Sequence, residues 1–149
     1  MKGYIVSVNI SETKGVKKKE IPEAVMVPDY GIENDAHAGN WHRQVSLLAN
    51  ESIDKMREKG LVLDPGDFAE NITTRYIDLV SLPIGTKVRV GEEVLLEISQ
   101  IGKVCHERCA IYYQAGDCIM PREGIFAKVM EGGRIRKGDV LEVLSAKGS

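Results

Sequence analysis

Short segments in which apolar and polar residues alternate recur along the chain, and each of them predicts a β-strand. In the first, the apolar residues Tyr4, Val6, Val8 and Ile10 are spaced two apart. Two others flank the turn Gly91-Glu92-Glu93 and predict the clearest hairpin of the chain. The predicted strands are Gly3–Ile10, Ala24–Val27, Gln44–Ala49, Thr86–Val90, Val94–Ile101 and Asp139–Leu144.

Helical patterns are fewer. Asn50 is a favourable N-cap for a helix over Glu51–Lys59, which Gly60 would end. One or two helical turns are expected at Glu107–Gln114. A further helix is predicted over Pro121–Met130, in which two apolar residues are four apart and a glycine pair follows.

Many short strands with a few helices between them predict a mainly β fold, a β-barrel with a few short helices. A parallel α/β sheet would need regular alternation of strand and helix, which the sequence lacks. The chain of 149 residues has the common size of one domain and contains no repeat or linker. We therefore expect a single domain over residues 1–149.

Charge and hydropathy limit the binding partners and the cellular locations that the sequence predicts. With 20 Lys+Arg against 22 Asp+Glu, the net charge is −2, which argues against a general nucleic-acid binder. No apolar run is long enough to cross a membrane, and the first residues do not resemble a signal peptide. The expected location is the cytoplasm, where the three cysteines would stay reduced. The sequence leaves the oligomeric state open.

All three cysteines lie between Gln100 and Gly124. Cys105 follows a predicted strand and has Lys103, His106 and Arg108 close by in the sequence, and such cations favour the reactive thiolate. Cys109 and Cys118 fit equally well as small buried apolar residues. The spacing matches a zinc site poorly, because zinc ligands usually come in two close pairs. A nucleophilic dyad with His106 would also require an oxyanion hole.

Other polar segments each allow a structural and a functional interpretation. Lys14 to Glu20 is a basic loop or hairpin of the kind that usually forms a solvated edge. His37, two residues after Asp35 in a turn-rich loop, is more often a structural hydrogen-bonding residue than a ligand. Arg43, at the start of a strand, could form a salt bridge or bind an anion.

Two further candidates are a pair before a strand and a cation before a predicted helix. Glu70-Asn71 could cap a turn, or could present a carboxylate and an amide to a polar heterocycle. Arg122 lies where a helix would begin, and helix N-termini favour anions. A surface ion pair of Arg122 with Glu70 or Glu123 explains the spacing as well.

Taken together, these segments resemble the MOSC domain, named for the C-terminal part of molybdenum-cofactor sulfurases and found also as small stand-alone bacterial proteins. The resemblance extends from about Gly3 to Leu144. Asn34 stands where many stand-alone members have glycine, and Asn tolerates the positive φ of such a turn. Val104 stands where many have proline. The matching motifs are Gly31–Gly39, His42–Leu48, Gly66–Thr73, Leu82–Thr86, Gln100–His106 and Gly116–Ala127.

The resemblance implies a β-rich barrel and a function in molybdenum-cofactor metabolism. Cys105 would carry sulfur as a persulfide or bind molybdenum directly. Cofactor binding would involve residues that surround this cysteine, namely Arg43, Asn71, Lys103, His106 and Arg122. At the level of the family, pyridoxal phosphate binding is also implied.

Several functions remain open on this basis. The chain could bind the molybdenum cofactor (molybdopterin) and carry sulfur, received from a pyridoxal-phosphate cysteine desulfurase. Alternatively, it could be the molybdenum-dependent reductase component for N-hydroxylated compounds. It shows no iron–sulfur, flavin or nicotinamide motif, so that reductase would need an electron-transfer protein. A barrel that binds an unrelated anion is the remaining alternative.

Overall fold

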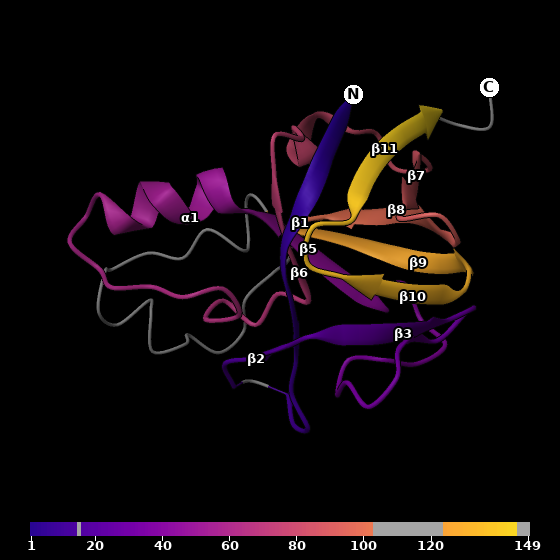
Figure 1. Ribbon diagram of the computed structural model, residues 1–149, viewed down its shortest axis with the longest axis horizontal. Helices are drawn as coiled ribbons and strands as arrows, with labels where there is room; N and C mark the ends of the chain where they lie inside the picture. The colour runs from indigo at the N-terminus through magenta and orange to yellow at the C-terminus, as the bar shows by residue number, and fades with distance from the viewer. Residues whose placement is uncertain (15, 103–123, 146–149) are drawn as a thin grey trace.

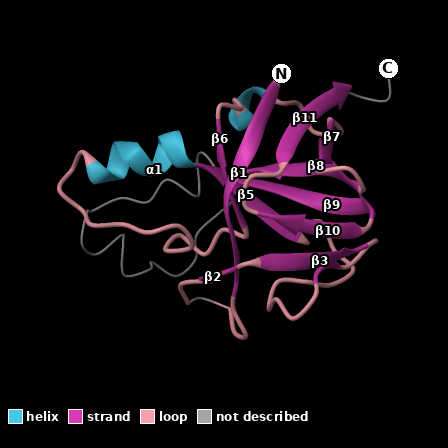
Figure 2. Cartoon of the chain, in the orientation of Figure 1, coloured by secondary structure: helices cyan, strands magenta, loops and turns pink. Residues whose placement is uncertain are grey.

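The strands form one large closed sheet and one small sheet (Figure 1). The computed structural model describes residues 1–14, 16–102 and 124–145. Figure 2 shows the predominance of strand over helix in these residues. The elements are β1 (Lys2–Ile10), β2 (Lys19–Ile21), β3 (Glu23–Val27), β4 (Gly31–Ile32), β5 (Val45–Ala49), α1 (Asn50–Arg57), β6 (Ile72–Arg75), the 3₁₀ turn η1 (Leu79–Ser81), β7 (Lys87–Val90), β8 (Val94–Ile101), β9 (Ile125–Glu131), β10 (Gly133–Arg136) and β11 (Val140–Ser145).

A barrel forms because the first and last strands of the sheet pair with each other. In the part of the chain that the structure describes, the order is β11-β7-β8-β9-β5-β6-β1, and β1 pairs with β11 to close the ring. The strand β2 pairs with the second half of β1, and β10, β3 and β4 form the small sheet. β5 and β6 run parallel, whereas the other described pairs are antiparallel. The predicted mainly β barrel is confirmed.

Two apolar clusters stabilise this architecture. The larger fills the barrel with Val, Ile and Leu side chains from its strands, as expected for a chain with few aromatic residues. The smaller lies between α1 and the outside of the barrel and contains Ile53, Met56, Phe68 and Phe126. The helix α1 projects to one side of the barrel in Figure 1, and this second cluster attaches it.

Most predicted strands are confirmed within a residue or two of their observed ends. The helix prediction needs one correction at Asn50. α1 begins at Asn50 itself, the N-cap position is the extended Ala49, and no side chain caps the helix. Because β5 continues directly into α1, the Asn50 side chain lies inside the first turn. Its Oδ1 accepts a hydrogen bond from Nη1 of Arg57 at 3.2 Å.

The prediction of a helix over Pro121–Met130 is wrong for its described part, because β9 covers Ile125–Glu131. Ile125 and Val129 are four residues apart, a spacing compatible with one helix face and also with one strand face. Ala127 between them is buried in the same barrel cluster, which gives a period of two. Pairing with β8 and β5 on its two sides determines the outcome. Residues 121–123 and the helical turns expected at Glu107–Gln114 lie outside the described residues.

Candidate functional site

Arg43 is half-buried and lies two residues before β5, the strand that pairs in parallel with β6. Its Nε donates a hydrogen bond to Oε1 of Gln100 at 3.1 Å. The guanidinium carbon also lies 5.3 Å from the ring centroid of Phe126, over a side chain of the buried cluster under α1. A side chain held by a hydrogen bond and a ring has little freedom to rotate, so the position of this cation is defined.

The chain enters and leaves the cysteine segment beside Gln100. Gln100 Nε2 donates to the carbonyl oxygen of Gly102 at 2.7 Å, and the Gly102 amide donates to the carbonyl oxygen of Gly124 at 2.6 Å. Segment 103–123 therefore begins and ends beside the residue that Arg43 contacts. The predicted site residues within it, Lys103, Cys105, His106 and Arg122, lie outside the described residues, as do Cys109 and Cys118.

The loop before Arg43 is organised by a buried ion pair. Nζ of Lys18 lies 2.7 Å from Oδ1 of Asp35, and both side chains are fully buried. The same carboxylate accepts hydrogen bonds from the backbone amides of Ser11 and His37. Lys18 lies in the basic run that was expected to be a solvated edge, so that expectation is wrong for this one lysine.

The Lys18 ammonium also contacts His37. Nζ of Lys18 lies 2.7 Å from Asp35 Oδ1, 2.9 Å from Ser11 Oγ and 3.0 Å from His37 Nδ1. An ammonium group has three hydrogens and no lone pair, so Nδ1 of His37 must accept. His37 thus has the hydrogen-bonding role that the sequence favoured.

Trp41 connects this loop to Arg43. Its Nε1 donates to the carbonyl oxygen of His37 at 2.8 Å. The guanidinium carbon of Arg43 lies 6.0 Å from the centroid of its ring, and Nζ of Lys14 lies 4.9 Å from it. Asn34, in the turn after β4, has φ of 70° and so adopts the positive φ expected for its position. The sequence analysis missed Trp41, although a single tryptophan in a polar loop next to an arginine is a detectable signal.

Asn71 directly precedes β6, and Arg43 lies two residues before β5, so both lie at the start of the parallel pair. It is fully buried, and its amide joins three strands. Its Oδ1 accepts from the backbone amide and hydroxyl of Ser46, and its Nδ2 donates to the carbonyl oxygen of Asn9. These bonds hold β1, β5 and β6 together. A contact between Asn71 and a cofactor stays a prediction.

Glu70 lies in the polar cluster beside Asn71, and no part of it is exposed. Its Oε2 accepts from Oγ1 of Thr73 at 2.7 Å and from the Gly66 amide at 3.0 Å. Its Oε1, like Oδ1 of Asn9, has no hydrogen-bond partner among the described residues. Burial disfavours the charged form and raises the pKa of Glu70, while the bonds from Gly66 and Thr73 oppose this in part.

Gly66 brings this cluster against the Lys18 loop. Its carbonyl oxygen accepts from the Lys18 amide at 2.8 Å. It has φ of 91°, and a Cβ at this position would collide with the carbonyl oxygen of Lys18. Glycine is therefore required here, and its backbone links Glu70 to Lys18.

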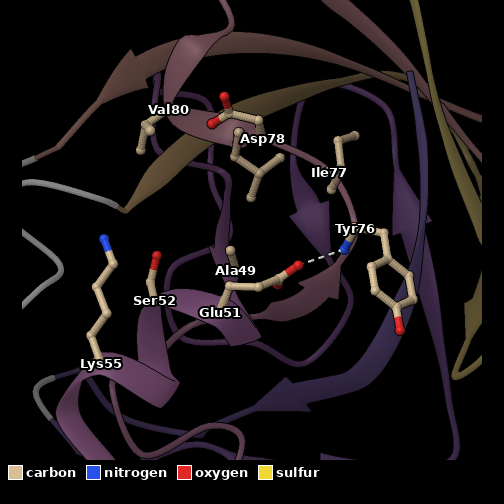
Figure 3. A pocket seen from close by; sticks show the side chains of 9 residues that line it. Ala49, Glu51, Ser52, Lys55, Tyr76, Ile77, Asp78 and Val80 are labelled. Atoms are coloured by element: carbon tan, nitrogen blue, oxygen red, sulfur yellow. Dashed lines mark hydrogen bonds between the residues drawn. The ribbon is translucent and has the colours of Figure 1, made fainter. Parts of the chain in front are cut away.

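A cavity of about 380 Å³ lies at the opposite end of β5 (Figure 3). Figure 3 shows the carboxylate of Glu51 bonded to the backbone nitrogen of Tyr76, at 2.8 Å. The cavity contains none of the side chains predicted as site residues. Its lining consists of Ala49, Glu51, Ser52, Lys55, Tyr76, Ile77, Asp78, Leu79 and Val80.

Two features are absent from residues 1–14, 16–102 and 124–145. No group of three or more His, Cys, Asp or Glu side chains there could hold a metal ion. No described helix has the length and apolar character needed to span a membrane.

Comparisons with known proteins identify the fold and the family. A search of curated proteins gave no match. The structure is similar to that of the YuaD protein from Bacillus subtilis, with a TM-score of 0.79, 20% identity and 96% of each chain covered. It is also similar to YiiM from Geobacillus stearothermophilus, with a TM-score of 0.71 and 18% identity over 96% of this chain and 75% of that one. It is similar as well to YiiM from Escherichia coli, with a TM-score of 0.68 and 21% identity over 96% of this chain and 70% of that one.

The family profile described as MOSC domain matches residues 34–142, which is well over half of the chain. The matched range begins in the Asp35 loop and includes Arg43, the Glu70-Asn71 pair and the cysteine segment. The chain belongs to the MOSC domain family.

Proposed function

We propose that this protein binds the molybdenum cofactor and uses Cys105 to carry sulfur as a persulfide or to ligate molybdenum. The observation that carries the proposal is the family match over residues 34–142, which contains Cys105 and the motifs around it. The described geometry is compatible with it, because the segment that contains Cys105 begins and ends beside the Arg43–Gln100 contact.

Arg43 fits the phosphate of such a cofactor. A guanidinium has five N–H donors, and one of them, on Nε, is bound to Gln100. Its Nη groups have no hydrogen-bond acceptor among the described residues. Two parallel N–H groups match two oxygens of a phosphate, and the interaction is stronger at a half-buried site than in open water.

The other residues have separate tasks in this proposal. Cys105 provides the sulfur, and Lys103, His106 and Arg122 supply positive charge that keeps it a thiolate. Asn71 holds β5 and β6 in register beneath the site, whether or not it also contacts the cofactor. The bound cofactor would supply the molybdenum chemistry, and a soft thiolate suits the selective capture of that metal.

The test is a titration with isolated molybdenum cofactor that compares wild type with Cys105→Ala. We expect the variant to lose the cofactor or the sulfur transfer while its circular-dichroism spectrum and melting temperature stay close to wild type. Cys118→Ala is the matched control and should bind normally. Unchanged binding by Cys105→Ala would overturn the proposal.

Two further measurements separate the forms of the proposal. Incubation with a cysteine desulfurase, followed by alkylation and mass spectrometry, would detect a persulfide on Cys105 if the protein carries sulfur. Turnover of an N-hydroxylated compound in the presence of an electron-transfer protein would instead support the reductase component. A protein that shows neither behaviour but binds the cofactor would act as a binding module.

A further inference from the structure

Three side chains from two loops meet beside the barrel and are called here the cation–indole corner: Lys14, Trp41 and Arg43. Lys14 comes from the loop between β1 and β2, and the other two residues precede β5. Nζ of Lys14 and the guanidinium carbon of Arg43 lie 4.9 and 6.0 Å from the centroid of the Trp41 ring. Two cations are thus brought to one aromatic ring.

Neither cation forms an ion pair with a carboxylate in the part of the chain that the structure describes. Two aspartates of the adjoining loop already have partners. Asp35 is bound to Lys18, and Asp29 accepts from the side-chain amides of Asn40 and Gln44.

The corner combines a fixed donor with an adaptable one. Arg43 is held by Gln100 and by the ring of Phe126, which is almost fully buried. Lys14 is exposed and attached through a flexible stem. Trp41 is itself fixed by its bond to the carbonyl oxygen of His37. A planar fork of defined direction with a mobile ammonium beside it can bind an oxyanion without reorganising the loop.

We propose that the cation–indole corner is a receptor for a tetrahedral oxyanion, either a phosphate monoester or a free oxyanion of the same shape. Arg43 binds two of its oxygens, Lys14 moves from the indole to a third, and Trp41 forms the wall between them. This inference shares Arg43 with the proposed function and goes beyond it in two respects: it gives a binding role to Lys14 and Trp41, and it requires no chemistry at Cys105.

Trp41 is the one tryptophan in the sequence, so its fluorescence reports directly on this corner. We would titrate the protein with inorganic phosphate, inorganic molybdate and glycerol 3-phosphate, with sodium chloride at equal ionic strength as the reference. A saturable change with at least one of the three oxyanions is expected. Affinity should fall as salt rises, because the attraction is between charges. The absence of a saturable change with all three, or the same change with chloride, would overturn the proposal.

The variants test which residues bind. Arg43→Gln and Lys14→Gln should each weaken binding about tenfold or more, because each removes a charge-assisted contact. Arg43→Lys, which keeps the charge but loses the fork, should fall between wild type and Arg43→Gln. Lys137→Gln, at an exposed turn far along the sequence, is the matched control and should bind as wild type does. Equal affinities for Arg43→Gln, Lys14→Gln and Lys137→Gln would contradict the assignment.

The three ligands also identify the source of the oxyanion. Tighter binding of glycerol 3-phosphate than of inorganic phosphate supports a phosphate monoester as the natural ligand. Tighter binding of molybdate supports a free oxyanion. A protein that binds phosphate at this corner but fails the cofactor titration would overturn the proposed function and leave the receptor. Cofactor binding by a protein that shows no saturable response to any of the three oxyanions would overturn the receptor and leave the proposed function.

Discussion

Lys14 and Lys18 lie four residues apart in one basic loop, yet the structure uses them in opposite ways. The side chain of Lys18 is fully buried and its three protons meet three acceptors, from Ser11, Asp35 and His37. Lys14 is exposed, contacts the face of Trp41 and is in no ion pair among the described residues. A charge with a complete set of partners can only stabilise the fold, whereas a charge without them is available to a ligand.

Arg43 combines both situations in one side chain. Its Nε is bound to Gln100 and its guanidinium is close to Phe126, so one end belongs to the fold. The Nη end has no acceptor in the described part of the chain. The contrast between Lys18 and the cation–indole corner therefore predicts which substitutions reduce stability and which reduce binding.

The largest effect is expected from Asp35→Ala. It would leave the Lys18 ammonium buried without its carboxylate, and two backbone amides would lose their acceptor. Breaking one side of a buried pair costs about 3–5 kcal/mol of unfolding free energy. Urea denaturation would measure this, with Asp35→Asn as the milder variant that keeps an acceptor oxygen. Lys17→Met, at an exposed lysine, is the control and should change the stability little. Equal losses for Asp35→Ala and Lys17→Met would contradict the structural role of the pair.

Gly66→Ala is expected to cause the second-largest loss of unfolding free energy. Gly66 and Gly60 have nearly the same φ, 91° and 92°, but a Cβ on Gly60 meets nothing within 4 Å whereas one on Gly66 meets the Lys18 carbonyl. The positive φ alone costs about 1–2 kcal/mol in either variant. The collision should raise the cost for Gly66→Ala to about 3 kcal/mol or more. Similar unfolding free energies for the two variants would show that Lys18 and Gly66 are not tightly packed.

Glu70→Gln should change how stability depends on pH. Burial raises the pKa of Glu70 above its ordinary value of 4.5, so the folded state holds this proton more tightly than the unfolded state does. The resulting stabilisation is complete below about pH 4.5 and is lost as the pH rises through the folded-state pKa.

The measurement is the unfolding free energy of wild type and Glu70→Gln from about pH 4 to 9. In the variant, the unfolding free energy should no longer fall as the pH rises through the folded-state pKa of Glu70. The variant should therefore be more stable than wild type at the alkaline end. Glu92→Gln, at the exposed turn of the β7–β8 hairpin, is the control. Parallel pH curves for wild type and Glu70→Gln would rule out a raised pKa.

The smallest effects on stability are expected at the cation–indole corner. Lys14→Gln should leave the unfolding free energy within about 0.5 kcal/mol of wild type. Arg43→Gln should cost about 1 kcal/mol, because it loses one hydrogen bond and a contact with an aromatic ring. Urea denaturation would measure the unfolding free energy of both variants beside that of Asp35→Ala. A loss for Lys14→Gln as large as that for Asp35→Ala would remove the distinction between the two lysines.

Local patterns were sufficient for much of the fold. The strands of the β7–β8 hairpin could be predicted because alternation and turn residues act over a few positions. The same holds for the positive φ of Asn34. Of the candidate site, the sequence indicated Arg43, and the structure places it next to Gln100 at the corner where segment 103–123 begins and ends. The prediction for Cys105 concerns a residue outside the described ones.

Tertiary structure alone decided the outcomes that depend on partners distant in the sequence. Ile125–Glu131 became a strand because β8 and β5 pair with it on both sides, although the spacing of its apolar residues also fits a helix. Lys18 is buried because Asp35 and His37, 17 and 19 residues later, return to it. The neighbours of Lys18 in the sequence are as basic as it is, so no local pattern could distinguish it. A charged side chain can be buried only where a partner of opposite charge contacts it, and that contact exists only in the folded chain.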